Sequence, residues 1–297
     1  MTHVIQSFTE IAPRYRALFC DLWGCVHNGH TPFPEAVAAL QAFRAQGGKV
    51  VLVSNAPRPK PSVIKQLDRI GVPHDAYDEV VTSGDATQYA MFSGSAGHKL
   101  HHIGTMPKDE PFFTEFSDPV IAELAQKNPI TRVPMAEAEG IICTGPEDEI
   151  NGQPEDYRAA FLLAKTNGLT MLCANPDIVV DYGEKRIFCA GALAALYEEM
   201  GGKVLYFGKP HPPIYDLARR RLAAMAGPVA DEDILCVGDG INTDVLGAML
   251  ENLDSLFLTE GLNARQFGPA DDLHEVGLNE WLAQEQRNPT YTMGFLR

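Results

Sequence analysis

The chain of 297 residues has few basic residues and no long apolar run. Lysine and arginine number 24 against 39 aspartates and glutamates, which gives a formal net charge of −15 at pH 7. This charge argues against a nucleic-acid partner and against an anionic membrane surface, because both would repel it. No run approaches the roughly 18 apolar residues of a membrane-spanning helix. Anionic small substrates remain open, since a bound cation inverts the local field.

The sequence also lacks closely paired cysteines and a recognisable leader. Its six cysteines are scattered, mostly within apolar runs (Cys20, Cys25, Cys143, Cys173, Cys189 and Cys236). We expect them to be reduced core residues rather than disulfides or metal ligands, because no Cys-x-x-Cys pair is present. The first residues contain no basic segment followed by an apolar one, so we expect no signal peptide and a cytoplasmic location.

Strand and helix patterns alternate from residue 17 onward. Short apolar runs at Ala17–Cys20, Lys49–Ser54 and Val80–Ser83 predict buried strands, and each is followed by a helical pattern. Strands that are apolar on both faces and separated by helices are typical of parallel sheets with right-handed crossovers. We therefore predict an α/β fold with a doubly wound, mainly parallel sheet.

The middle of the chain interrupts this pattern. A small Gly/Ser-rich junction at Ser93–Gly97 is followed by strands and helices of irregular spacing, and the first pattern resumes near the strand Val204–Phe207. We expect a core formed by residues 1–94 and 207–297, with an inserted α/β cap domain at 95–206. The tail Asn288–Arg297 has no clear periodicity, which predicts a mobile segment or an interface arm.

Polar side chains follow four of the predicted core strands. They are Asp21, the pair Ser54-Asn55, Lys209, and finally Asp239 with Asp244. The carboxyl ends of parallel strands meet at one edge of a sheet, so these groups are expected to converge. Three crowded carboxylates repel one another unless a cation neutralises them, and an all-oxygen cluster suits Mg²⁺. Lys209 and the Ser54 hydroxyl would hold the remaining oxygens of a phosphoryl group.

Each of these residues also has a plainer interpretation. Asp21 and Ser54 can cap turns, and Asp239 and Asp244 flank a Gly/Asn turn. The stretch Gly238–Gly240 resembles a dinucleotide-binding loop, but it has two of the three glycines required and would place Asp239 against a pyrophosphate. The four stretches together favour a metal and phosphate site.

Four motifs in order resemble the haloacid dehalogenase (HAD) superfamily, and specifically the class with a large cap between the second and third motifs, which includes NagD-like, pyridoxal-phosphate and phosphoglycolate phosphatases. The motifs are Asp21-Leu22-Trp23-Gly24, Val53-Ser54-Asn55, Gly208-Lys209-Pro210-His211-Pro212 and Gly238-Asp239-Gly240-Ile241-Asn242-Thr243-Asp244. Two further stretches resemble parts of the cap, namely Asn175-Pro176-Asp177 and Ala190-Gly191-Ala192-Leu193. The resemblance spans nearly the whole chain.

The resemblance implies a role for each matching residue. Asp21 would be the nucleophile that forms an aspartyl-phosphate, and it would bind Mg²⁺ together with the backbone carbonyl of Trp23 and the side chain of Asp239. Asp244 would hold the metal directly or through water. Lys209 would stabilise the nucleophile and the transferring group. Ser54 and the amide of Asn55 would bind phosphate, and Asn175 and Asp177 would belong to a substrate-binding loop or simply to a turn.

Trp23 departs from the phosphatase pattern, which has an aspartate at this position as general acid and base. Indole has no proton that is acidic at neutral pH, so Trp23 cannot take that role. Either Trp23 fills the space of the missing acid or it stacks on the substrate, and His27, His30 and Asp177 are candidates to replace the acid. The expected protein is a slow phosphatase, a phosphatase for esters with good leaving groups, or a protein that binds phosphate without turnover.

We therefore predict Mg²⁺-dependent hydrolysis of a small phosphorylated metabolite in the cytoplasm, with cap closure excluding water. The alternatives are a catalytically impaired phosphate-binding protein, and a phosphotransferase or C–P-cleaving enzyme that uses the aspartyl intermediate differently. Cap-mediated dimers occur in the class that the chain resembles, so a homodimer is also open.

Overall fold

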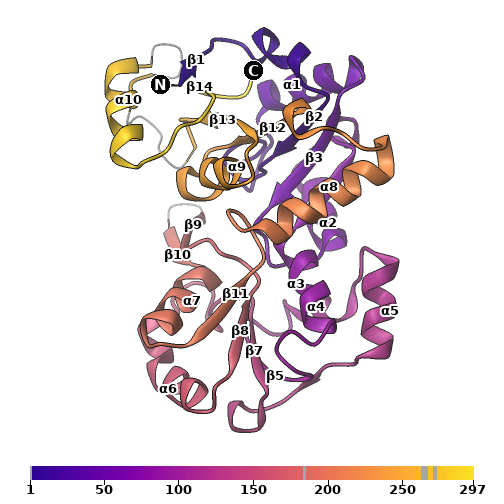
Figure 1. Cartoon of the computed structure of the whole chain (residues 1–297), viewed down its shortest axis with the longest axis vertical. Coiled ribbons are helices and arrows are strands. Elements are labelled where there is room, and N and C mark those ends of the chain that lie inside the picture. Colours follow the sequence, from indigo (N-terminus) through magenta and orange to yellow (C-terminus); the bar gives the residue numbers. More distant parts are fainter. Residues whose placement is uncertain (1, 183–184, 262–266, 270–272) are drawn as a thin grey trace. The chain divides into compact units, whose positions relative to one another are not determined.

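The computed structural model describes residues 2–182, 185–261, 267–269 and 273–297, and in it the chain forms two compact units (Figure 1). The first unit contains Met1–Ser54, Lys65–Val81 and Tyr215–Arg297, so it draws on both ends of the chain. The second contains Asn55–Ile64 and Thr82–Ile214. Each unit has a parallel sheet of its own.

The sheet of the first unit has seven strands in the order β1-β14-β13-β12-β2-β3-β4. Their bounds are β1 His3–Val4, β2 Ala17–Cys20, β3 Lys49–Ser54, β4 Glu79–Thr82, β12 Ile234–Gly238, β13 Asp254–Leu258 and β14 Tyr291–Met293. From β1 to β3 every neighbouring pair is parallel. All residues of β2 and β12 are buried, as expected for central strands that are covered on both faces.

Helices flank this sheet, as the doubly wound prediction requires. Three of them lie wholly in the first unit: α1 Pro34–Ala45, α9 Leu246–Leu250 and α10 Glu275–Gln284. Two more, α2 Lys60–Ile70 and α8 Pro212–Ala226, are divided between the two units. Helix α1 shows how the sequence forms them: Pro34 occupies its first turn, and buried residues recur at helical spacing through Val37, Leu40 and Phe43. The predicted α/β fold is confirmed.

The second unit has a five-stranded parallel sheet in the order β11-β8-β7-β5-β6. Its strands are β5 Lys99–Ile103, β6 Thr131–Arg132, β7 Gly140–Cys143, β8 Thr170–Cys173 and β11 Lys203–Tyr206. Its helices are α3 Ser83–Phe92, α4 Glu110–Thr114, α5 Pro119–Lys127, α6 Arg158–Thr166 and α7 Ala190–Glu199. An antiparallel pair, β9 Val179–Tyr182 and β10 Lys185–Phe188, forms a separate two-stranded sheet.

Two expectations about the strands are wrong. The strand predicted at Val204–Phe207 is β11, which pairs with β8 of the second sheet, so Lys209 does not follow a strand of the first sheet. The tail predicted to be mobile or an interface arm contains the buried strand β14, which lies between β1 and β13. Both errors arise because strand pairing is decided by residues far away in the sequence.

Two other expectations agree with the described residues. All six cysteines are free and buried, so none of them forms a disulfide. No helix in the described part of the chain has the length and apolar content needed to cross a bilayer.

Candidate active site

Asp21 and Asp239 lie at the ends of two neighbouring strands of the first unit. Asp21 follows β2 and Asp239 follows β12, and the Asp21 N–H donates to the carbonyl of Val237 at 2.8 Å. Strands β3 and β4 lie on one side of β2, whereas β12 and β13 lie on the other. The chain therefore continues toward opposite edges of the sheet after β2 and after β12. At such a topological switch point, the carboxyl ends of the strands form the crevice in which open α/β sheets bind ligands.

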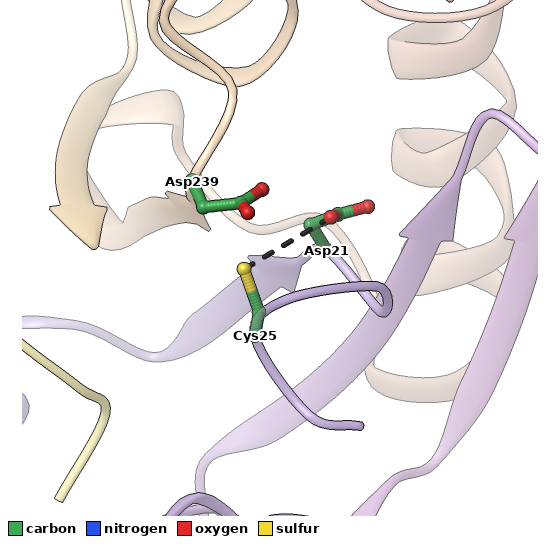
Figure 2. A group of neighbouring side chains, drawn as sticks. All are labelled: Asp21, Cys25 and Asp239. Atoms are coloured by element: carbon green, nitrogen blue, oxygen red, sulfur yellow. Dashed lines mark hydrogen bonds between the residues drawn. The ribbon is translucent and has the colours of Figure 1, made fainter. Parts of the chain in front are cut away.

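A tight loop after Asp21 brings a cysteine back to the two carboxylates. Gly24 has φ +79°, which L side chains rarely adopt, and its N–H donates to the carbonyl of His27 at 2.9 Å. Cys25, the next residue, points toward Asp21 and Asp239 (Figure 2). One potential ligand atom from each of these three side chains lies within 4.8 Å of the other two. All three side chains are buried, so the cluster lies away from bulk water.

Two glycines leave the space that the Asp239 carboxylate occupies. A Cβ on Gly24 would lie 2.2 Å from Asp239 Oδ2, and one on Gly261 would lie 1.8 Å from the same atom. Real Cβ atoms essentially never come that close to another heavy atom. The position of Asp239 therefore depends on the absence of side chains at residues 24 and 261.

Asp244 lies next to this cluster, in the turn that follows Asp239. Its carboxylate accepts hydrogen bonds from the N–H of Gly240 at 3.1 Å and from the Thr243 hydroxyl at 3.3 Å. The turn, Ile241–Val245, has π-helical geometry. Asp244 thus forms the turn, as its plainer interpretation predicts. Its buried carboxylate is also close enough for its charge to raise the pKa of Cys25. A metal role for Asp244, directly or through water, stays a prediction.

Burial raises the pKa of the Cys25 thiol well above its usual range, and the negative charges of Asp239 and Asp21 raise it further. The thiol therefore carries its proton at neutral pH. Its Sγ–H points to Asp21 Oδ2, with 3.9 Å between the heavy atoms. A neutral thiol adds no negative charge to a cluster that already holds two carboxylates.

The donor set is one that a divalent cation would neutralise. Asp21 and Asp239 are 8% and 3% exposed, and two carboxylates this close and this buried repel each other without a positive partner. Their oxygens are the ligands that Mg²⁺ prefers. The residues present fit the metal, with Asp21 and Asp239 as the side chains that would hold it. The predicted contribution of the Trp23 carbonyl, in the same loop, remains a prediction.

Trp23 packs within its own loop. Its half-buried indole meets the ring of His27 edge-on, with 5.4 Å between the ring centroids. A Cβ on Gly29 would lie 2.2 Å from the far end of the indole, so the ring packs against the backbone of Gly29 and needs a glycine at that position. His27 Nδ1 accepts the N–H of Gly29 at 2.9 Å, and His30 is exposed. These contacts support the interpretation that Trp23 is a packing residue.

The other predicted site residues lie mainly in the second unit, around the amide of Asn55. The Asn55 side chain accepts the N–H of Lys209 at 2.7 Å and donates to the carbonyl of the same residue at 3.0 Å. It also donates to Asp177 Oδ1 at 2.8 Å. Asn175 is buried, and its side-chain oxygen accepts the N–H of Asp177 at 3.0 Å. One buried amide thus fixes the backbone of Lys209 and orients Asp177.

Ser54 is the last residue of β3, in the first unit, directly before Asn55. Reasoning from the sequence alone missed two features of the site, one at Asn55 and one at Cys25. The phosphate contact predicted for the amide of Asn55 stays a prediction, and reasoning from the sequence missed that the Asn55 side chain holds the peptide of Lys209. Cys25 was predicted to be a plain core residue, and the only signal in the sequence was its position four residues after Asp21, within a loop that contains a glycine.

Comparisons with known proteins agree with this geometry. A family model described as haloacid dehalogenase-like hydrolase matches residues 18–114, and one described as HAD-hydrolase-like matches residues 206–292. The chain is 24% identical over 256 residues to the ribonucleotide monophosphatase NagD of Escherichia coli strain K12, covering 83% of this chain and 88% of the relative.

Solved structures are similar over the same length. A hydrolase of the haloacid dehalogenase-like family from Brucella suis is 38% identical, with a TM-score of 0.83 over 99% of this chain and 100% of the other. The glycerol phosphate phosphatase of Mycobacterium tuberculosis, solved in complex with magnesium, is 24% identical, with a TM-score of 0.66 over 99% of this chain and 78% of that protein.

Proposed function

Because the chain belongs to the haloacid dehalogenase-like hydrolases, we propose that it is a Mg²⁺-dependent phosphatase that hydrolyses a small phosphomonoester through an aspartyl-phosphate on Asp21. The observation that carries the proposal is the buried pair Asp21 and Asp239 at the carboxyl ends of β2 and β12. The relatives support the class of reaction, since proteins similar over most of this chain are named as phosphatases.

Asp21 is the residue proposed to react. One of its carboxylate oxygens attacks phosphorus, the bond from phosphorus to the ester oxygen breaks, and that oxygen leaves with the electron pair of the bond and takes a proton from solvent to give the alcohol. Water then attacks phosphorus and loses a proton to solvent, the bond from phosphorus to the Asp21 oxygen breaks, and phosphate leaves with the Asp21 carboxylate restored. Strand β12 holds the backbone of Asp21 in place for this attack, since the Asp21 N–H donates to the carbonyl of Val237 in that strand.

Asp239 and the metal supply charge stabilisation. When bound, Mg²⁺ offsets the negative charge of the carboxylates and of the phosphoryl oxygens, which otherwise repel the nucleophile. Asp239 keeps its position because Gly24 and Gly261 leave space for its carboxylate. Lys209 is proposed, from the resemblance of its motif, to stabilise the transferring group, and Asn55 to hold the backbone of Lys209 in place for that role.

Trp23 determines which substrates react fast. No proton donor occupies its position, so the leaving oxygen departs without the help that general acid catalysis gives, typically about 10²–10⁴-fold. Esters of acidic alcohols such as p-nitrophenol need this help least. We therefore propose that the enzyme hydrolyses p-nitrophenyl phosphate far better than an alkyl phosphate such as glycerol phosphate.

The test compares the initial rates of phosphate release from these two esters, with and without Mg²⁺, in the parent and in Asp21→Asn. The proposal expects Mg²⁺-dependent release in the parent and none in the variant. Equal rates in the parent and Asp21→Asn would refute it. The second candidate function is a protein that binds phosphate without turnover, and the packing of the Trp23 indole in its own loop favours it. It holds if the parent binds phosphate but releases none from either ester. Transfer of the phosphoryl group to an added alcohol would instead indicate a phosphotransferase, and C–P cleavage would be tested with a phosphonate.

A further inference from the structure

Cys25 gives the carboxylate pair a sulfur atom that an Mg²⁺ site does not need. Its Sγ lies 3.9 Å from Asp21 Oδ2 and belongs to the group of ligand atoms within 4.8 Å that also includes Asp239 (Figure 2). Cys25 is 2% exposed, so the sulfur faces the cluster rather than solvent. Magnesium binds oxygen ligands and has little affinity for sulfur, whereas thiolates select softer cations.

The spacing suits a tetrahedral ion. A zinc ion binds sulfur at about 2.3 Å and carboxylate oxygen at about 2.1 Å, so sulfur and oxygen ligands on one such ion lie about 3.6 Å apart. The separation of 3.9 Å between Cys25 Sγ and Asp21 Oδ2 is therefore close to what one ion would require. The third ligand atom, on Asp239, lies within 4.8 Å of both.

We propose that Cys25, Asp21 and Asp239 form a mixed sulfur–oxygen site for thiophilic divalent cations such as Zn²⁺ and Cd²⁺, in competition with Mg²⁺. On binding, the Cys25 thiol gives its proton to solvent and a metal–sulfur bond forms. Two carboxylates and one thiolate then share one divalent ion. With two carboxylates and a thiolate on one divalent ion, the bound ion no longer offsets the negative charge of the phosphoryl oxygens, so a thiophilic cation that displaces Mg²⁺ inhibits the enzyme.

The inhibition rests on the proposed phosphatase function, but the site itself does not. A purely structural thiol is the opposing interpretation, since a buried cysteine packs like a small apolar side chain. The two interpretations differ in one observable, which is a bond between sulfur and metal.

The experiment titrates the full-length apoprotein with CdCl₂ and follows the ultraviolet charge-transfer absorption of a cadmium–thiolate bond, without any substrate. We expect one equivalent of absorbing complex, lost in Cys25→Ala and kept in Cys143→Ala, which removes another buried cysteine in the second unit. Added Mg²⁺ should shift the titration to higher Cd²⁺ concentration. Cys25→Ala should weaken Cd²⁺ binding, measured by equilibrium dialysis, by at least about tenfold, since loss of even an outer partner of a metal costs that much.

Absorption of equal size in Cys25→Ala overturns the inference, as does Cd²⁺ binding without the band or no binding at all. Circular dichroism of both variants confirms that they are folded. If the parent gives the band but releases no phosphate from p-nitrophenyl phosphate with Mg²⁺, the proposed function fails and the metal site stands. If it hydrolyses the ester but gives no band, the metal site fails and the function stands.

Discussion

A single methyl group at residue 24 tests how closely Asp239 is held against the loop after β2. In Gly24→Ala the new Cβ would lie 2.2 Å from Asp239 Oδ2, whereas ordinary contact begins at 3.4 Å, so the oxygen has to retreat by about 1.2 Å. Gly24 also has φ +79°, and an alanine held in that conformation costs about 1 to 2 kcal/mol. The substitution therefore strains the backbone and displaces a proposed metal ligand.

Gly47→Ala separates these two effects. Gly47 has φ +94°, but a Cβ there would meet nothing within 4 Å, so this variant has the strain without the collision. We expect Gly47→Ala to lose about 1 to 2 kcal/mol of unfolding free energy in the absence of metal, and Gly24→Ala to lose at least as much, because the collision adds to the strain. Only Gly24→Ala should also lose affinity for Mg²⁺.

The assay is thermal unfolding with and without Mg²⁺. At a concentration of about 100 times Kd, a bound ion stabilises the folded state by about 2.7 kcal/mol, and a 100-fold rise in Kd reduces this to about 0.4 kcal/mol. We expect the Mg²⁺-induced rise in Tm to persist in Gly47→Ala and nearly to vanish in Gly24→Ala. An equal rise in both variants would refute the placement of Asp239 in the metal site.

Three further predictions concern the second unit and Trp23. Asn55→Ala should lower the unfolding free energy by about 2 to 4 kcal/mol in urea denaturation, because it removes both hydrogen bonds between the Asn55 side chain and the buried peptide of Lys209; a loss below about 1 kcal/mol would contradict this. Trp23→Asp should raise kcat for glycerol phosphate by up to about 10²–10⁴-fold and that for p-nitrophenyl phosphate far less, whereas equal changes would argue against the missing acid. Burial lowers the pKa of His102 from 6.5 to about 4, so the folded protein binds this proton less readily than the unfolded chain. The stability that neutral His102 contributes should be lost as pH falls from about 6.5 to about 4, and His102→Gln should flatten that part of the stability profile; an unchanged profile would count against it.

The central strands could be predicted because their sequences alone determine that they are buried. Ala17–Cys20 and Ile234–Val237 are continuous apolar runs next to turn residues, and the structure has strands at both. The last strand, Tyr291–Met293, could not be predicted in this way. Its three residues show no period, and it is a strand because β1 and β13 pair with it on either side.

The residues of the candidate site likewise fall into those that could be placed from the sequence and those that could not. Asp21 and Asp239 could be placed at one sheet edge from sequence, since each directly follows an apolar run. Lys209 follows such a run as well, but β11 belongs to the other sheet, and the four residues of a short parallel strand do not encode which sheet they join. The sulfur of Cys25 reaches the carboxylates through the positive φ of Gly24, which is a property of the folded loop rather than of residue spacing.

The central claim is that Asp21 becomes phosphorylated, and acid quenching of the reacting enzyme tests it most directly. With Trp23 in place of an acid and base, no residue at that position activates water, so the aspartyl-phosphate should decay slowly and accumulate. We predict that protein quenched during turnover of labelled p-nitrophenyl phosphate with Mg²⁺ contains up to one covalent phosphate, located on the peptide that includes Asp21, and that Trp23→Asp contains less. Hydrolysis that proceeds with no label on that peptide, and that persists in Asp21→Asn, would contradict the account.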